Sequence, residues 1–426
     1  MLLTYQARNS EVETKAYATD DYFGFLDDNE GASDISARMD IGVGRLPVSS
    51  VDDAMGVARK IQTFLSNQNP GKWRQQLMFV ADDGDKNMHT KIGDLAAERV
   101  RCNNLSFVVN KIYLDAYTQE ASASGESYPL AKNRFLSLIN SGILFFDYSG
   151  HGGYNNISSE SLLTLRDCRM MTNANQGFWM LATCGFAHFD AYEPSASEEA
   201  VINPDGGAIA VMSACRTVFA SANRELNRNL CDTLFGHRNE FSYNMTIGDA
   251  CRIAKNMTGS DENKLSFVLL GDPAIRLPFP TDYRVRTEQA ADTLNALTLH
   301  DFTGWIESAD GDTAREFNGV VNITMMDKMQ QITTRNNDND EPTLDEVVTH
   351  TYNDYPNTLY QGQTRVNNGH FRFSFMTPKD IRYNYGNGRI TYYALDSING
   401  EGIGHFEDFV VGGTSSVEII DTIGPD

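Results

Sequence analysis

The chain has 426 residues, of which 41% are hydrophobic and 22% charged, a composition typical of folded globular protein. This length predicts two or three domains. The net charge is −22, so the chain has no excess of cations to offer phosphates. Nucleic acid and anionic lipid surfaces are therefore excluded as its main partners.

The sequence shows neither a membrane span nor a targeting signal. Its longest apolar runs are of strand length, far below the roughly 18 residues that a spanning helix needs. The first residues lack a charged region followed by a cleavable apolar one. Because residues 4–8 (TYQAR) read as the middle of a folded domain, we expect the chain to be a fragment of a longer protein.

Six cysteines are spread over the chain without tight spacing. They match neither a CxxC metal site nor a small disulfide framework, and most of them are expected to be buried free thiols.

The first predicted domain spans residues 1–280, and from residue 40 onward it alternates apolar strand-like runs with helical patterns. Apolar side chains recur at three and four residues after the candidate N-cap Ser50, which predicts an amphipathic helix over 51–65. Further helices are expected near residues 92–100, 130–139, 161–170, 223–235 and 246–257, and strands at 77–80, 107–109, 143–146, 178–181 and 207–212. This order predicts an α/β domain with a mostly parallel sheet covered by helices on both faces.

Residues 281–426 have the texture of an all-β domain. In His370–Phe375 every second residue is aromatic, and turn signals such as Asp310-Gly311 separate the short strands. We expect an immunoglobulin-like β-sandwich here, with room for the start of a further segment at its C-terminus. The domain carries 10 basic and 23 acidic residues, and 335–346 is expected to be an exposed loop.

Three predicted strands of the first domain run into chemically suggestive residues. Asp82 and Asp83 follow the first, His151 the second and Cys184 the third. Parallel strands gather these ends at one edge of the sheet, where ligands bind. A thiol attacks only as thiolate, and histidine is its usual base near neutral pH. The alternative is that the GHGG sequence around His151 is a tight turn and Cys184 a buried thiol.

The motifs around this pair resemble those of a known family. Residues 146–152 (FDYSGHG) and 182–184 (ATC), with Cys184 33 residues after His151, resemble the gingipain family of cysteine peptidases, which has a caspase-like fold. Residues 40–47 (DIGVGRLP), 80–85 (VADDGD) and 269–273 (LLGDP) are similar to that family as well.

The resemblance implies roles for individual residues. His151 would activate Cys184, and the backbone amides of Gly152 and Cys184 would hold the oxyanion. Asp82 and Asp83 are candidates to orient His151, although each also fits a capping or turn acid. No cofactor is required by this chemistry, and any metal is unknown.

Three segments of the β region are similar to a branch of this family, the sortases of the bacterial type IX secretion system. They are residues 317–319 (FNG), 359–362 (LYQG) and 385–388 (YGNG). The resemblance implies removal of the C-terminal signal domain of secreted cargo and transfer of the cargo to a surface lipopolysaccharide. It also implies an outer-membrane β-barrel partner, other type IX components and a place on the outer face of the outer membrane.

Two other functions stay open. One is a secreted endopeptidase that cleaves after Arg or Lys. The other is a catalytically silent surface scaffold whose β-sandwich binds a partner.

Several further residues have two interpretations each. His188 fits a second base or a loop residue, and Cys215 fits a cleft thiol or a structural one. Arg216 and Arg224 would bind a substrate carboxylate or form ion pairs. The loop at 118–127, rich in small residues, would gate the cleft.

Two acidic stretches raise the question of calcium. Asp20-Asp21 and residues 27–30 (DDNE) resemble loose Ca²⁺ ligand clusters, but their spacing matches no EF-hand loop. A structural calcium ion is therefore an expectation beside the alternative of solvated loops.

Overall fold

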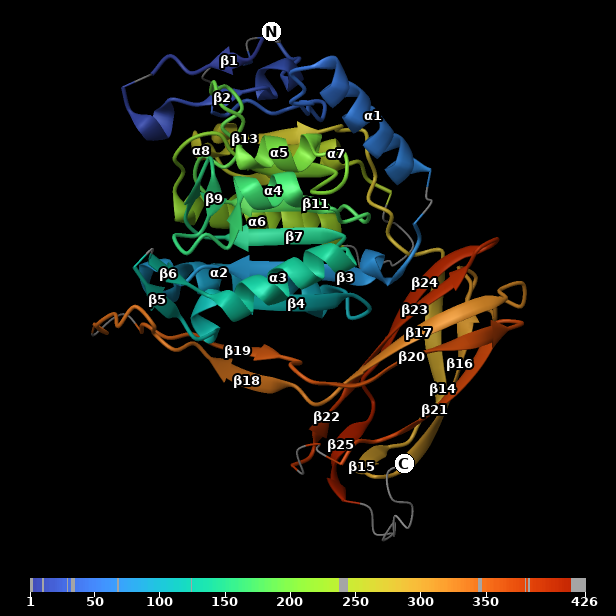
Figure 1. Ribbon diagram of the computed structural model, residues 1–426. Helices are drawn as coiled ribbons and strands as arrows, with labels where there is room; N and C mark the ends of the chain where they lie inside the picture. The colour runs from blue at the N-terminus through green and yellow to red at the C-terminus, as the bar shows by residue number, and fades with distance from the viewer. Residues whose placement is uncertain are drawn as a thin grey trace. The chain divides into compact units, whose positions relative to one another are not determined.

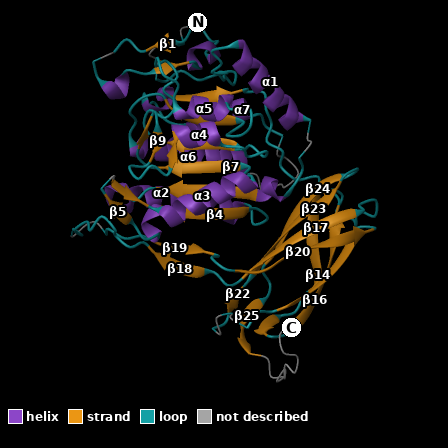
Figure 2. Ribbon diagram, in the orientation of Figure 1, coloured by secondary structure: helices purple, strands orange, loops and turns teal. Residues whose placement is uncertain are grey.

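The computed structural model describes residues 3–9, 11–28, 30–31, 35–66, 69–123, 125–236, 244–343, 347–379, 381 and 384–414. The chain forms two compact units (Figure 1). The first comprises residues 1–104, 109–279 and 333–351, and the second 105–108, 280–332 and 352–426. Helices and strands alternate in the first unit, whereas the described part of the second contains strands and no helix (Figure 2).

The first unit is built on a six-stranded sheet with the order β13-β12-β11-β7-β3-β4. Its strands are β3 (Gln76–Ala81), β4 (Val108–Tyr113), β7 (Phe145–Ser149), β11 (Phe178–Ala182), β12 (Ala210–Ala214) and β13 (Phe267–Gly271). The pairs β3–β7, β7–β11 and β11–β12 are parallel, and β13 is an antiparallel edge. The expected mostly parallel sheet is confirmed.

Eight α-helices lie in the described part of this unit. They are α1 (Val51–Leu65), α2 (Gly84–Asn103), α3 (Pro129–Ser141), α4 (Leu165–Met170), α5 (Ala196–Ile202), α6 (Ala220–Phe235), α7 (Ile247–Met257) and α8 (Asn263–Ser266). Each of the six predicted helices corresponds to one of them. Capping boxes open α1, α4 and α5, where the side chains of Ser50, Thr164 and Ser195 accept from the third backbone N–H of each helix.

Helices cover both faces of the sheet because successive strand residues point to opposite sides. One face carries Met78, Phe146 and Trp179, which form one core with side chains of α3 and α5. On the other face Phe145 contacts Phe235 of α6 edge to face. Continuous apolar strands buried on both sides produce this arrangement.

Helix α1 buries a different side from the one that its apolar pattern suggests. Val51, Met55 and Leu65 of the apolar stripe are 75%, 54% and 59% exposed. The buried side instead carries Lys60, whose Nζ donates to four backbone carbonyls at and after the end of α5. These bonds satisfy orphan carbonyls at a helix C-terminus, where a cation is favoured.

The second unit closes its main sheet into a barrel with the order β14-β16-β21-β20-β17-β23-β24. These strands are β14 (Tyr283–Gln289), β16 (Leu299–Glu307), β17 (Gly319–Met326), β20 (Thr358–Asn367), β21 (His370–Met376), β23 (Arg389–Asp396) and β24 (Gly400–Phe406). As predicted, β21 buries Phe371, Phe373 and Phe375 on one side. The expected immunoglobulin-like sandwich of two separate sheets is not what these strands form, because alternation specifies one buried face and not how a sheet closes.

Short strands complete the described structure in pairs and triplets. They are β1 (Tyr5–Gln6) with β2 (Ala18–Thr19), β5 (Glu120–Ser122) with β6 (Gly125–Ser127), β8 (Gly152–Gly153) with β9 (Asn156–Ile157) and β10 (Leu163–Thr164), β18 (Gln330–Thr333) with β19 (Thr351–Asp354), and β15 (Thr293–Ala296) with β25 (Val410–Thr414) and β22 (Gly386–Asn387).

Residues 333–351 belong to the first unit although the surrounding sequence belongs to the second. Asp115 accepts hydrogen bonds from the backbone amides of Asn336 and Asn337 and from the side chain of Asn87. The expected exposed loop at 335–346 is confirmed for residues 335–343, which Asp115 anchors at their start, and 344–346 lie outside the described residues.

Candidate active site

The strand register brings His151 and Cys184 to the same level of the sheet edge. Strands β7 and β11 are parallel neighbours with Ser149 opposite Ala182, and His151 and Cys184 each follow two residues later. Neighbouring strands lie about 4.8 Å apart. The two side chains therefore start from adjacent positions, as predicted, although no hydrogen bond joins them in the described structure.

Asp82 holds the backbone of His151 and not its ring. Its Oδ2 accepts from the His151 N–H at 2.6 Å, and the Tyr148 hydroxyl lies 3.2 Å from the same oxygen. Burial raises the pKa of Asp82 well above its usual value. Asp83 is hydrogen-bonded by the Tyr128 hydroxyl, and burial raises its pKa to about 7. Neither predicted acid is therefore placed on the imidazole.

The carboxylate beside the His151 ring is that of Asp85, which sequence reasoning missed. Asp85 Oδ2 lies 3.3 Å from His151 Nε2. Asp85, Lys86 and Asn87 have φ of 54°, 55° and 60°, so the chain makes a left-handed turn at the start of α2. Such backbone is costly for residues with side chains and is concentrated at functional sites. The available sequence signal was the acid-rich end of β3.

A second histidine, His89 on α2, completes this group and was also missed. Its ring lies edge to face against His151 with centroids 4.9 Å apart, and its Nε2 is 3.4 Å from Asp85 Oδ2. Burial and the neighbouring His151 lower the pKa of His89 to about 4. His89 is therefore neutral near pH 7. No sequence pattern signals this contact, because the left-handed turn at Asp85–Asn87 interrupts the helical spacing between Asp85 and His89.

Cys184 is half-buried at the end of β11. Burial raises the pKa of its thiol, and the Val218 N–H, 3.5 Å from Sγ, opposes that rise. Because the resting thiol is protonated near neutral pH, it needs a base at the moment of attack.

The two amides predicted for the oxyanion are unused by the surrounding backbone. The Ser158 N–H donates to His151 O, so Gly152 stands in the non-hydrogen-bonded pair of the β8–β9 ladder. For Cys184 N–H, no acceptor lies within reach among the described residues, although its neighbours Thr183 and Gly185 both donate. Both donors remain available to an incoming oxyanion.

His188 belongs to a separate ion-pair group. Its Nε2 is 3.5 Å from Asp190 Oδ1. Arg216 binds the same carboxylate with two nitrogens, at 2.8 and 2.6 Å. These bonds hold the pKa of Asp190 at about 2 despite partial burial. Arg216 is therefore committed to an internal ion pair.

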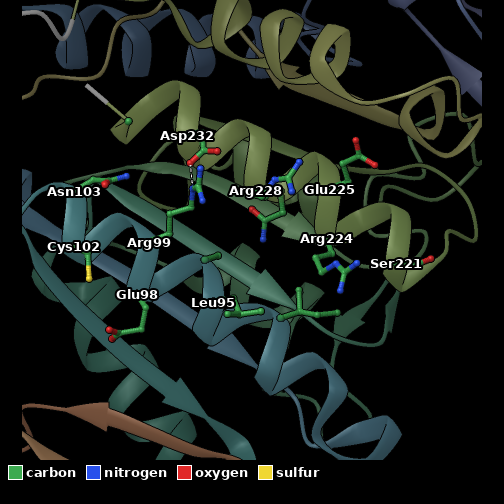
Figure 3. Close-up of a pocket in the computed structure, with 14 residues that line it drawn as sticks. Leu95, Glu98, Arg99, Cys102, Asn103, Ser221, Arg224, Glu225, Arg228 and Asp232 are labelled. Carbon is green, nitrogen blue, oxygen red and sulfur yellow. Dashed lines mark hydrogen bonds and ion pairs between the residues drawn. The ribbon is translucent and has the colours of Figure 1, made fainter. Parts of the chain in front are cut away.

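Arg224 lines a groove between α2 and α6, together with Arg99, Arg228 and Glu225 (Figure 3). Arg99 pairs with Asp232 there, whereas Arg224 has no ion pair among the residues that the structure describes. None of the groove residues is His151, Cys184 or Asp85.

The remaining cysteines are free thiols, four of them buried. Cys168, Cys215, Cys231 and Cys251 are buried and Cys102 is exposed. Burial raises the pKa of Cys215 to about 11, and its thiol donates to Ala18 O. Cys215 is thus a structural thiol.

The acidic stretches differ in what they contact. Asp20 pairs with Arg45 and Asp21 with Lys255, so neither pair of oxygens is free for calcium. Asp27, Glu30 and Asp40 bring one oxygen each within 4.8 Å of the others. Calcium at these three carboxylates stays a prediction, and Asn29 lies outside the described residues.

The predicted gating loop at 118–127 contains the exposed hairpin β5–β6, with Ser124 outside the described residues. Its gating role stays a prediction. No helix among the described residues is both long and apolar enough to cross a membrane.

The fold is that of a peptidase of the gingipain type. The chain is similar to solved structures of the Arg-specific cysteine proteinase gingipain R (RgpB; TM-score 0.51, 14% identity, covering 93% of this chain and 79% of that one) and of the Porphyromonas gingivalis RgpB pro- and mature domains (0.50, 14%, 92% and 81%). At this identity the likeness shows the fold.

A third solved structure is that of dimeric latent PorU from Porphyromonas gingivalis. It is 23% identical over 99% of this chain, with a TM-score of 0.35, and this chain spans only 35% of it. No curated protein matches the sequence.

The family itself follows from the sequence match. The profile of peptidase family C25 covers residues 1–278, and the chain belongs to that family. It is a cysteine peptidase.

Proposed function

We propose that this chain is the catalytic part of a PorU-like sortase of the type IX secretion system. One observation supports the thiol mechanism most strongly. His151 and Cys184 each follow, by two residues, directly paired positions at the same edge of the sheet. The motifs in the β region favour the sortase branch over secreted endopeptidases.

In this proposal His151 takes the proton of Cys184 as Sγ attacks the peptide carbonyl of the cargo. Asp85 accepts the His151 Nε2–H, which leaves Nδ1 as the base and makes Asp85 a positioning residue. The amides of Gly152 and Cys184 stabilise the oxyanion, and His151 returns the proton to the leaving amine. An amine of the acceptor, or water, then opens the thioester.

The proposed substrate is cargo with a C-terminal signal domain, and the acceptor a surface lipopolysaccharide. The partners are a PorV-like outer-membrane β-barrel and other type IX components, at the cell surface. No cofactor enters this scheme.

The test compares full-length protein carrying Cys184→Ala with a Cys102→Ser control, in which the exposed thiol is removed. Mass spectrometry of cargo should show the signal domain retained with Cys184→Ala and removed with the control. Undiminished removal by the Cys184→Ala protein would contradict the proposal and favour a silent scaffold. Efficient cleavage of short Arg or Lys peptides would favour the endopeptidase instead.

A further inference from the structure

The side chains of Asp85, His89 and His151 present three ligand atoms to one point. One ligand atom from each side chain lies within 4.8 Å of the other two, and Asp85 Oδ2 is 3.3 Å from His151 Nε2 and 3.4 Å from His89 Nε2. Zinc bonds to nitrogen and carboxylate oxygen are about 2.0–2.2 Å long, so ligand atoms around a tetrahedral ion lie about 3.3 Å apart. The Asp85 contacts already have that spacing.

His89 is a buried histidine whose ring nitrogen Nε2 is poorly hydrogen-bonded. It is only 5% exposed, yet among the described residues its Nε2 makes no well-aligned hydrogen bond and has only the 3.4 Å contact with Asp85 Oδ2. A buried polar nitrogen whose hydrogen bond is long and poorly aligned costs free energy. The cost would be offset if this nitrogen bound an ion between the three side chains.

The open side of the group lies toward solvent. His151 and Asp85 side chains are 51% and 52% exposed, whereas His89 is buried beneath them. An ion can therefore enter past Asp85 and His151, and water can fill the fourth position. The left-handed turn at Asp85, Lys86 and Asn87 fixes the carboxylate between the two rings.

We propose that Asp85, His89 and His151 bind a divalent transition-metal ion, Zn²⁺ or one of similar ligand preference. A ligand set of two imidazoles and one carboxylate binds such ions in preference to Ca²⁺ and Mg²⁺, which favour oxygen ligands. The site is distinct from the carboxylate group of Asp27, Glu30 and Asp40, which offers oxygen only.

Metal binding would switch off the peptidase, a consequence that rests on the proposed function. A metal ion on His151 Nε2 displaces the proton that Asp85 would hold there. The remaining ring proton then resides on Nδ1, so His151 no longer has a lone pair with which to deprotonate Cys184. The ion acts as a reversible inhibitor without touching the thiol.

The binding test uses untagged protein with Cys184→Ala and Cys102→Ser, so that neither the nucleophile nor the exposed thiol supplies a ligand. Calorimetric titration with Zn²⁺ should give one site per chain. Asp85→Asn and His89→Gln should each weaken binding at least 10-fold, whereas His188→Gln, which alters the other histidine–aspartate pair, should leave it unchanged. Asp85 is exposed, so Asp85→Asn keeps the test decisive if His89→Gln does not fold.

Absence of binding, or unchanged affinity in Asp85→Asn, would overturn the metal site whatever the activity. The inhibitory consequence has its own arm, in which Zn²⁺ is added to active full-length protein and then removed by a chelator. The rate of each protein is expressed as a fraction of its own uninhibited rate. On that scale, the inhibition constant for Zn²⁺ should be at least 10-fold higher in His89→Gln than in the unchanged protein. Tight binding without inhibition would leave the metal site standing and contradict the role of His151.

Discussion

Two histidine–aspartate pairs lie in the first unit, and they differ in what else the carboxylate contacts. Asp190 faces His188 but is bound by two nitrogens of Arg216. Asp85 faces His151 and His89, and among the described residues it pairs with no lysine or arginine. A carboxylate already neutralised by a guanidinium has less charge to offer an imidazolium.

In the proposed mechanism, the same residue types serve stability at His188 and Asp190 and chemistry at His151 and Asp85. Burial and then Arg216 lower the pKa of His188, so this ring is a poor proton acceptor. The His151 ring is half-exposed, and it shares the Asp85 carboxylate only with His89 among the described residues. The comparison predicts that changes at His151 and Asp85 affect turnover and that changes at Asp190 affect stability.

The largest expected effect is on signal removal when each histidine is replaced. His151→Gln should lower kcat/KM on the order of 1,000-fold, because general acid–base catalysis is worth about 10²–10⁴-fold. His188→Gln should stay within about threefold of the unchanged protein. Equal losses in the two variants would show that the pairs do not differ in function, and circular dichroism of both proteins serves as the folding control.

A smaller effect on turnover is expected when Asp85 loses its charge. Asp85→Asn should lower kcat about 10- to 100-fold with KM nearly unchanged, because the ring loses its orientation while the substrate contacts remain. Asparagine also tolerates the left-handed backbone. Steady-state kinetics of Asp85→Asn and Asp190→Asn, measured side by side, separates the roles of the two aspartates. A loss of kcat in Asp190→Asn alone would assign the positioning role to Asp190 instead of Asp85.

The smallest effect concerns stability and its pH dependence. Arg216 holds the pKa of Asp190 near 2, below the ordinary value of about 3.9, so the ion pair stabilises the fold above pH 4. Asp190→Asn should cost about 1–2 kcal/mol at pH 7 after screening by water, and the difference should vanish as the pH falls from 4 through 2. Urea unfolding at several pH values measures it, and a constant difference down to pH 2 would contradict this account.

The dyad was accessible to sequence reasoning because each partner directly follows an apolar strand. The run before His151 and the run before Cys184 predict buried strands of one sheet, and parallel strands present their carboxyl ends at the same edge. Asp85 was not accessible in the same way. Its contact depends on a left-handed turn that no propensity predicts for Asp, Lys and Asn in succession.

Helix α1 is a second place where the sequence pattern does not predict a tertiary contact. Its apolar period predicted the element and its ends, but not which side is buried. Lys60 is buried because four backbone carbonyls from residues far along the chain accept hydrogen bonds from its Nζ. The periodicity of one helix does not predict hydrogen bonds to residues so distant in the sequence.

The central claim is that His151 activates Cys184, and limited alkylation tests it without a substrate. Iodoacetamide is added to the full chain, and peptide mapping gives the rates at Cys184 and at the exposed Cys102, which is the internal reference. The account predicts that His151→Gln slows alkylation of Cys184 at least 10-fold and leaves Cys102 unchanged. An unchanged ratio of the two rates would contradict it.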